Sequence, residues 1–160
     1  MTSEKDHDDT EPMFVAVPNR HPAVLDAVNR AKASVPEFRR LLATNRGPGV
    51  FHSAKLRFRD PEWSARLGED RFVNLWLTVT EADKDGFEGS AFELPKEITW
   101  LQVGKPVRFT DDDIVDWMVN DKGHLFGGFS LRVTRAALPE ERRASFDEHI
   151  GVTSYDGADA

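Results

Sequence analysis

The chain of 160 residues is long enough for one folded domain and leaves little room for two. Hydrophobic residues make up 39% and charged residues 31%, which is an ordinary composition for a soluble globular domain. The absence of cysteine excludes disulfides, thiolate nucleophiles and cysteine-ligated metal centres, and the formal net charge of -7 argues against nucleic acid and anionic membranes as partners.

The negative charge is concentrated at the two ends of the chain. Residues 1–12 carry five acidic side chains and one lysine, and residues 147–160 carry four acidic side chains and no basic one, so the stretch between them is close to neutral. Residues 1–12 and 151–160 are therefore predicted to be disordered acidic tails around a single domain at 13–150. The acidic N-terminus does not have the basic start and long apolar core of a signal peptide, which makes the cytoplasm the expected location.

The first region with a clear pattern is helical. A short apolar run at 14–17 precedes it and predicts an edge strand. Apolar residues from Val24 to Leu42 then recur at alternating spacings of four and three, which places them on one stripe of a helix. Pro36 interrupts this stripe at a position suited to a first helical turn. The pattern therefore predicts two helices, or one kinked helix, over residues 22–43.

The region that follows is rich in strand-forming residues. Between positions 54 and 59, apolar residues alternate with basic ones, as expected for a half-buried strand. The basic residues are Lys55, Arg57 and Arg59. Residues 72–80 are apolar on both faces and predict a central strand, which the Asp85-Gly86 turn connects to a returning strand. Further strands are predicted at 106–110 and 125–134, with a final helix opened by Pro139.

Together these elements predict an α+β fold. An N-terminal helix or kinked helical hairpin would pack on a strongly bent antiparallel sheet or a partly closed small barrel, and a C-terminal helix would follow the last strand. The Gly127-Gly128 pair is expected to mark a bulge or a close backbone approach in that strand.

Several motifs occur in an order that points to a family. The most specific are Lys55-Leu56-Arg57-Phe58, Ile114-Val115-Asp116-Trp117-Met118 and Gly127-Gly128-Phe129-Ser130-Leu131-Arg132. On these motifs residues 22–134 resemble the YegJ-like family of small bacterial proteins, a domain of unknown function. The chain departs from the family pattern at Val73-Asn74, where relatives often have Glu-His, and at Glu93, where they often have Asn. The resemblance implies an order of elements and no activity.

The chain shows no recognisable metal or cofactor motif. The carboxylates at 111–113 and Asp116 are clustered, but they lack the alternate spacing, the glycine and the distal glutamate of a calcium loop. None of the five histidines is paired with another at a spacing typical of metal ligands. We therefore predict no metal and no other cofactor.

Asp116, beside Trp117, is the candidate polar residue with the clearest context. Arg132, on the predicted last strand, has the geometry to engage its carboxylate through two parallel hydrogen bonds. In the structural interpretation this pair locks a turn onto the last strand. In the functional interpretation Arg132 stays available to bind an anion in a groove. The candidate binding residues are Trp76, Asp116, Trp117, Gly127, Gly128 and Arg132.

Three function classes remain open. A non-enzymatic binding module for a protein partner or a small anionic ligand, in one form an accessory or immunity-type protein, is favoured because no nucleophile elbow or phosphate loop is present. The alternative is an enzyme acting on a small anionic substrate, with Asp116 or His124 as acid or base and Arg132 as anion clamp. A further alternative is a single-stranded nucleic-acid binder that uses Lys55, Arg57 and Arg59, although a solvated strand face is the simpler interpretation.

Overall fold

The computed structural model describes residues 20–157. The predicted acidic tail at 1–12 and the predicted edge strand at 14–17 lie outside these residues. The helices are α2 (Pro22–Ala33), α3 (Val35–Thr44), α4 (Pro61–Leu67), α5 (Phe129–Ala137) and α6 (Glu140–Ile150), with a 3-10 turn η1 (Asp111–Asp113). The strands are β1 (Val50–Arg59), β2 (Phe72–Asp83), β3 (Gly86–Ala91), β4 (Val107–Phe109), β5 (Ile114–Asp121), β6 (His124–Gly127) and β7 (Ser154–Tyr155).

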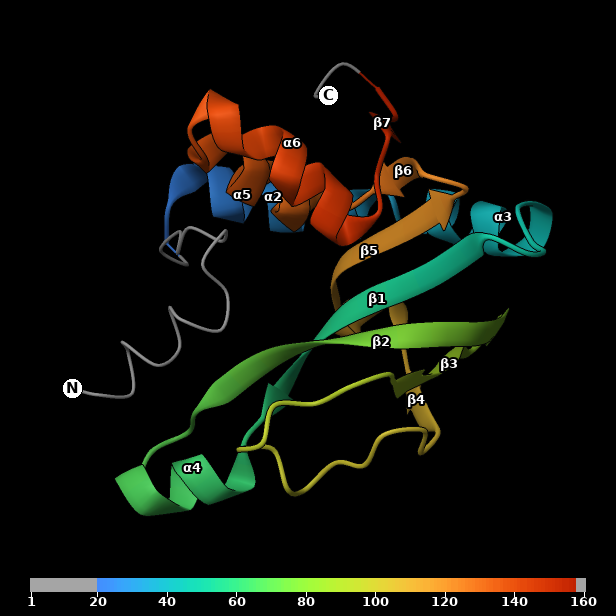
Figure 1. The fold of residues 1–160 in the computed structure, drawn as a ribbon. Helices are drawn as coiled ribbons and strands as arrows, with labels where there is room; N and C mark the ends of the chain where they lie inside the picture. Colours follow the sequence, from blue (N-terminus) through green and yellow to red (C-terminus); the bar gives the residue numbers. More distant parts are fainter. Residues whose placement is uncertain (1–19, 158–160) are drawn as a thin grey trace.

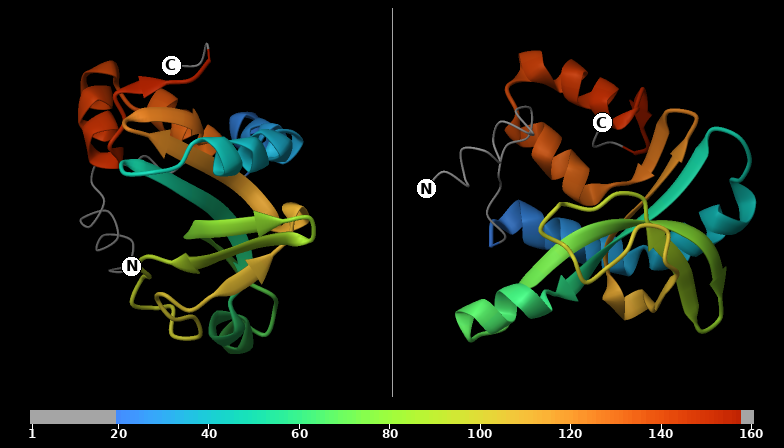
Figure 2. Two further views of the ribbon diagram at one scale, coloured as in Figure 1. Left: turned by 90° about the vertical axis from the view of Figure 1, so that its right-hand side faces the viewer. Right: turned by 60° about the horizontal axis from the view of Figure 1, so that its bottom comes forward.

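The strands form one curled sheet in the order β4-β3-β2-β1-β5-β6-β7 (Figure 1). Neighbouring strands are antiparallel except β6 and β7, which run parallel, so the sheet is mixed. The predicted α+β class is confirmed, and the sheet bends strongly without closing into a barrel (Figure 2).

The two faces of the sheet are covered differently. On one face, α3 and the end of α2 cover the main core, where the ring of Phe38 stacks on Trp117 with 5.2 Å between centroids. On the other face, Met118 packs into a smaller cluster that α6 and β7 also enter. Trp117 and Met118 are neighbours on β5 and therefore point to opposite faces. Figure 1 shows α5 and α6 beside β5 at one end of the sheet, and the same face of β2 is left exposed at Asn74 and Thr78.

The helical interruption predicted near Pro36 is present. Helix α2 ends at Ser34, whose hydroxyl donates to the carbonyl of Arg30 at 2.7 Å, and α3 begins at Val35 with Pro36 in its first turn. Proline suits a first turn because the N–H it lacks has no intrahelical partner there. The stripe of apolar residues is therefore divided between two helices.

The strand predicted at 125–134 is wrong beyond its first residues. Strand β6 ends at Gly127, and α5 begins at Phe129. Gly127 and Gly128 both have positive φ, 69° and 65°, which turns the chain from strand into helix. A Cβ on Gly127 would lie 2.4 Å from the carbonyl oxygen of Trp117, so the backbone approaches β5 too closely for a side chain.

The C-terminal residues also differ from the expected tail. Residues 151–157 are described, and Ser154–Tyr155 forms β7 beside β6. Tyr155 is buried, and its hydroxyl donates a short hydrogen bond to the carboxylate of Asp147. Burial of Tyr155 and Val152, together with backbone hydrogen bonds from Thr153 and Ser154 to Gly123 and from Asp156 to Leu125, holds this segment against the sheet.

Candidate functional site

Asp116 is buried at the centre of a polar cluster. Only 1% of its surface is exposed. Its carboxylate accepts hydrogen bonds from the backbone N–H groups of Trp117, Phe129 and Ser130 at 2.8, 3.1 and 2.8 Å, and from the Ser130 hydroxyl at 2.5 Å. Phe129 and Ser130 are the first residues of α5, whose N–H groups have no partner within the helix. Asp116 therefore caps α5 from the neighbouring strand.

Lys55 completes this Lys55–Asp116–Ser130 cluster. Its position on β1 lies opposite Asp116 on β5 and opposite Trp76 on β2. The Lys55 Nζ donates to Ser130 Oγ at 2.9 Å and lies 5.4 Å from the centre of the Trp76 ring. Burial lowers the pKa of Lys55, and the negative charge of Asp116 opposes that shift. Burial raises the pKa of Asp116, against the hydrogen bonds from Ser130 and the charge of Lys55.

The cluster contains the residue types of a serine nucleophile with a lysine base, but its donors are already engaged. The Ser130 O–H donates to Asp116, so it is not directed toward Lys55 as a proton acceptor. The N–H groups at the start of α5, which are the natural donors to an oxyanion, also go to Asp116. Beside it lies a cavity of only about 150 Å³, lined largely by valines. The arrangement therefore favours a structural role.

The predicted Asp116–Arg132 pair is wrong. Arg132 lies on α5, and its Nε–H donates to the carbonyl of Gly127 at 2.9 Å. Its remaining N–H groups donate to the carbonyls of Leu125 and Asp156, at 3.2 and 2.8 Å. Because the chain turns into a helix after Gly128, the guanidinium faces the C-terminal segment while Asp116 faces the helix start.

The other candidate residues fall in two places. Trp76 and Asp116 belong to the Lys55–Asp116–Ser130 cluster. Trp117, Gly127 and Arg132 line a separate pocket of about 190 Å³. Trp117 is itself buried, and its ring N–H donates to Ser34 Oγ at 3.0 Å, so most of this side chain is part of the core. The N-cap of α5, Gly128, is the link between the two places.

Asp116 has no hydrogen bond to His124, which was considered as an acid or base, and none to His52. His124 contacts Ser154 Oγ at 2.7 Å and a carboxylate oxygen of Asp156 at 3.4 Å. His52 donates from Nε2 to the carbonyl of Asn45 at 2.7 Å, and burial lowers its pKa. The two predicted acid or base groups, Asp116 and His124, are therefore engaged with different partners.

The three basic residues of β1 are also in different environments. Lys55 belongs to the buried cluster, and Arg59 donates to the carboxylate of Asp70 at 2.8 Å. The guanidinium of Arg57 lies over the ring of Phe72, 3.9 Å from its centre. Only Arg57 of the three thus presents a cation without a hydrogen-bonded partner among the described residues.

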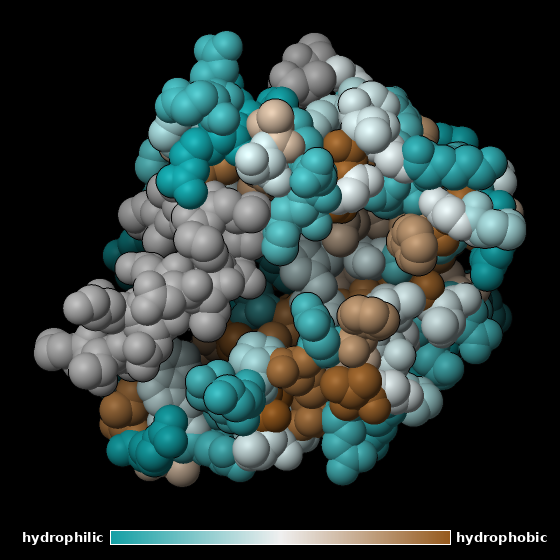
Figure 3. All heavy atoms as spheres, in the orientation of Figure 1, coloured by the Kyte–Doolittle hydropathy of each residue, from teal (hydrophilic) through white to brown (hydrophobic). Residues whose placement is uncertain are grey.

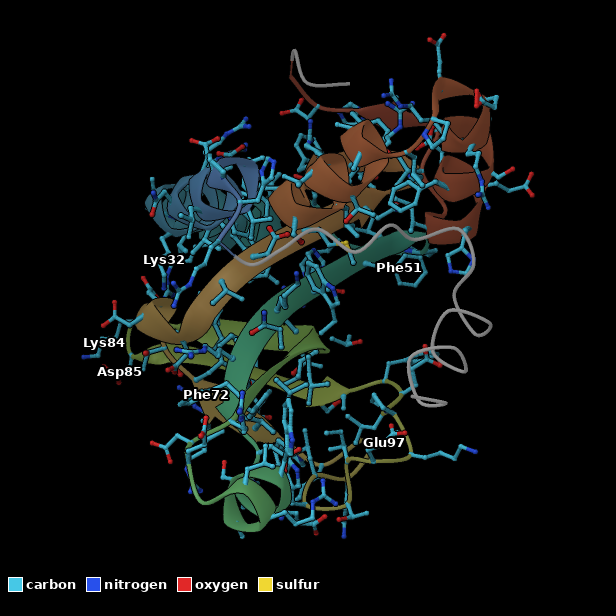
Figure 4. The ribbon with its side chains drawn as sticks, turned by 90° about the vertical axis from the view of Figure 1, so that its left-hand side faces the viewer. Lys32, Phe51, Phe72, Lys84, Asp85 and Glu97 are labelled. Atoms are coloured by element: carbon cyan, nitrogen blue, oxygen red, sulfur yellow. The ribbon has the colours of Figure 1, made fainter. Side chains whose placement is uncertain are left out.

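Arg57 lines a cleft that was not predicted from the sequence. Helix α4 and the start of β2 form its walls, and we call it the α4–β2 cleft. Figure 4 labels Phe72 near this helix. The cleft has a volume of about 660 Å³. Its lining residues are Arg20, Arg57, Trp63, Asp70, Arg71, Phe72, Val73 and Asn74.

Helix α4 begins at the Asp60-Pro61 pair. Asp60 caps it, with its carboxylate accepting from the N–H of Trp63 at 2.9 Å, and Pro61 fills the first position. An Asp followed by Pro is a typical start of a helix as well as a strand break. Gly68 ends the helix in the left-handed conformation. The helix has only seven residues, and it places Trp63 in the lining of the cleft.

Large apolar side chains are exposed in or beside the cleft, and the two aromatic ones stack with its arginines. Trp63, Leu67 and Phe72 are 38%, 48% and 40% exposed. Arg71 lies over the Trp63 ring at 5.5 Å, as Arg57 does over Phe72. The stacks restrict the two guanidinium groups, and the N–H groups of Arg57 have no hydrogen-bond partner among the described residues.

The comparisons with known proteins identify a family. The model of an uncharacterised protein conserved in bacteria, DUF2314, matches residues 21–153. The chain belongs to this family. The bacterial, unknown-function character that the resemblance implied is confirmed, whereas the YegJ-like name is not. No solved structure matches this DUF2314 chain.

A curated relative of this DUF2314 protein is larger than the matched region. Over 87 residues the chain is 31% identical to a Neisseria meningitidis serogroup B protein named "Putative ankyrin repeat protein NMB1133/NMB1171". The match covers 53% of this chain and 34% of that protein, so the chain matches about a third of its relative.

Among the described residues there is neither a group of metal ligands nor a membrane-spanning helix. Within residues 20–157, no three His, Asp or Glu side chains are grouped so that they could hold a metal ion. In the same residues, every helix is too short or too polar to cross a membrane.

Proposed function

We propose that this protein is a non-enzymatic binding module that holds a partner protein in the α4–β2 cleft. The observation that carries the proposal is the exposure of Trp63 and Phe72 in a cleft where both rings stack with arginines. Tryptophan, other aromatics and arginine dominate the energetics of protein interfaces. An accessory or immunity-type protein that docks on one cognate partner is a concrete form of this function.

Two further observations favour binding over catalysis. Of the groups with catalytic potential, Asp116 is buried and Lys55 and Ser130 are half-buried, and hydrogen bonds join the three through the Ser130 hydroxyl. The name of the Neisseria meningitidis relative refers to ankyrin repeats, which stack into extended binding surfaces.

A second exposed apolar surface is the alternative place where the partner could bind. Phe92 is 78% exposed, and Val103 is exposed beside it, where Ala91 bridges to Val103. Figure 3 shows apolar side chains gathered over the lower half of the visible face, where the segment joining β3 to β4 lies. Among the described residues no arginine stacks on Phe92, and for this reason we place the partner in the α4–β2 cleft.

A photo-crosslinking experiment tests this placement. A photoreactive amino acid is introduced at Leu67, at Val103 or at the exposed Glu148, and the full chain is irradiated in its native bacterium. We expect one partner to be captured from Leu67 and not from the other two positions. Capture from Val103 alone, or no specific adduct from Leu67, would contradict the proposal.

The captured partner is then purified and its affinity is measured. Trp63→Ala should weaken binding about tenfold or more, as hot-spot truncations do. Leu25→Ala removes another exposed apolar side chain, on α2, and should leave the affinity unchanged. Equal affinity of the wild type and Trp63→Ala would contradict the assignment of the cleft.

A further inference from the structure

We infer that the partner segment bound by the α4–β2 cleft is acidic, an extended stretch of Glu or Asp residues with a large apolar side chain among them. This inference rests on the proposed function and names the chemistry of its ligand. It follows from the charges that line the cleft, from the contacts and exposure of its arginines, and from the arrangement of these arginines in two stacks.

The charges that line the cleft are strongly unbalanced. Arg20, Arg57 and Arg71 line it together with one carboxylate, that of Asp70, and Arg71 also pairs with Glu69 outside the lining. Asp70 is already used, because it accepts the hydrogen bond from Arg59 at 2.8 Å. The rest of the folded region is close to neutral, so this excess of arginine is local. A ligand with several carboxylates supplies the missing counter-charge.

The arginines are held in orientations that suit carboxylates. Arg57 and Arg71 each lie over an aromatic ring, at 3.9 and 5.5 Å from its centre, and the N–H groups of Arg57 have no hydrogen-bond partner among the described residues. A planar guanidinium binds a carboxylate through two parallel hydrogen bonds, and a guanidinium that is already oriented loses little freedom in doing so.

Arg71 is incompletely satisfied within the chain. One of its terminal nitrogens pairs with Glu69 at 2.9 Å. Its Nε is buried and has no hydrogen-bond partner among the described residues. The Nε itself is out of reach of a ligand, but 41% of the Arg71 side chain is exposed, so a carboxylate in the cleft can bind its terminal N–H groups.

The separation of the cations favours an extended segment over a single small anion. Arg57 stacks on Phe72 from strand β1, whereas Arg71 stacks on Trp63 of α4, so the two cations belong to two different stacks. A lone phosphate is bound best by donors that converge on one point. Two arginine–aromatic stacks with partly exposed rings match alternating acidic and apolar side chains.

A peptide-binding experiment tests the acidic chemistry. The probe is a fluorescein-labelled peptide made of glutamates around one central leucine, and the matched peptide has glutamine in place of every glutamate. Fluorescence anisotropy with the full chain measures both affinities. We expect the glutamate peptide to bind at least about tenfold more tightly, with an affinity that falls as the salt concentration rises from about 0.05 to about 0.5 M.

Two charge-reversal variants, one in the lining of the cleft and one outside it, test whether the peptide binds in the α4–β2 cleft. Arg57→Glu should weaken binding of the glutamate peptide by about tenfold or more, because the reversal replaces an attraction by a repulsion. Arg66→Glu is the matched control. Arg66 is an exposed residue of α4 outside the lining of the cleft, so this variant should bind within about twofold of the wild type.

Each other outcome overturns the inference in a recognisable way. If the glutamine peptide binds equally well and Trp63→Ala still weakens it, the cleft holds a partner but does not select acidic chemistry, and the proposed function stands. If neither peptide binds, the acidic inference fails, while the crosslinking from Leu67 decides the proposed function independently. If inorganic phosphate at about 1 mM displaces the glutamate peptide completely, the cleft is a small-anion site.

Discussion

The Lys55–Asp116–Ser130 cluster and the α4–β2 cleft contain similar residues in opposite situations. Both place a basic side chain over an aromatic ring and a carboxylate nearby. In the cluster the carboxylate of Asp116 is buried and receives four hydrogen bonds. In the cleft Arg57 is exposed and has no carboxylate partner among the described residues. Polar groups that satisfy one another hold the fold, and those left unsatisfied at the surface are available to a ligand.

The energetic scale separates the two regions as clearly as the geometry does. Removing one partner of a buried charge pair costs about 3–5 kcal/mol, because the other charge is left without compensation. An exposed ion pair or cation–aromatic stack contributes about 1 kcal/mol or less. Substitutions in the cluster should therefore change stability, and substitutions in the cleft should change binding.

The largest expected effect comes from Asp116→Ala. It removes the cap of α5, leaves the N–H groups of Phe129 and Ser130 without their acceptor, and removes the negative charge that opposes the desolvation of Lys55. We expect the free energy of unfolding to fall by about 3–5 kcal/mol, measured by urea denaturation. Asp112→Ala, an exposed residue of η1, should cost less than about 0.5 kcal/mol. Equal stability of the two variants would show that Asp116 is not structural.

A smaller effect, with a pH signature, is expected for Lys55→Met. Burial already raises the pKa of Asp116 above 3.8, so the folded state binds more protons than the unfolded state in the range above that value. Loss of the Lys55 cation raises the pKa of Asp116 further and widens this range. The destabilisation relative to wild type should therefore grow with pH, reaching about 2 kcal/mol near neutrality.

Urea denaturation at about pH 4.5 and about pH 7 measures this difference. The destabilisation should be smaller at the lower pH, because a larger fraction of Asp116 is protonated there and needs no compensating cation. A penalty of the same size at both values would mean that Lys55 acts through packing alone and does not compensate the charge of Asp116.

The smallest expected change in stability is that of Arg57→Ala. It removes one exposed stack, between Arg57 and Phe72, so the free energy of unfolding should fall by less than about 1 kcal/mol. Thermal unfolding of the variant beside Asp116→Ala makes the comparison directly. A loss as large as that of Asp116→Ala would place Arg57 among the residues that hold the fold and would remove the contrast between the two regions.

Much of the candidate chemistry was recognisable in the sequence, although its partners were not. Asp116 stood out because a carboxylate beside a tryptophan in a β-rich stretch requires a partner. The partner assigned to it, Arg132, depended on extending a strand through Gly127-Gly128. A pair of glycines is compatible with a bulge and with a strand-to-helix turn, and only the positive φ of both residues distinguishes the two. Ser130 and Lys55, the actual neighbours, come from segments 75 residues apart.

Local patterns by themselves determined the order of most elements: the helix break near Pro36, the half-buried strand at 54–59 and the Asp85-Gly86 turn. These features depend on side-chain periodicity and on backbone preferences, which act between residues close in sequence. Tertiary structure decided which polar groups meet, because hydrogen bonds across a sheet depend on strand order and register. It also assembled the α4–β2 cleft from Arg57, Trp63 and Phe72, whose common environment exists only after β1, α4 and β2 fold against one another.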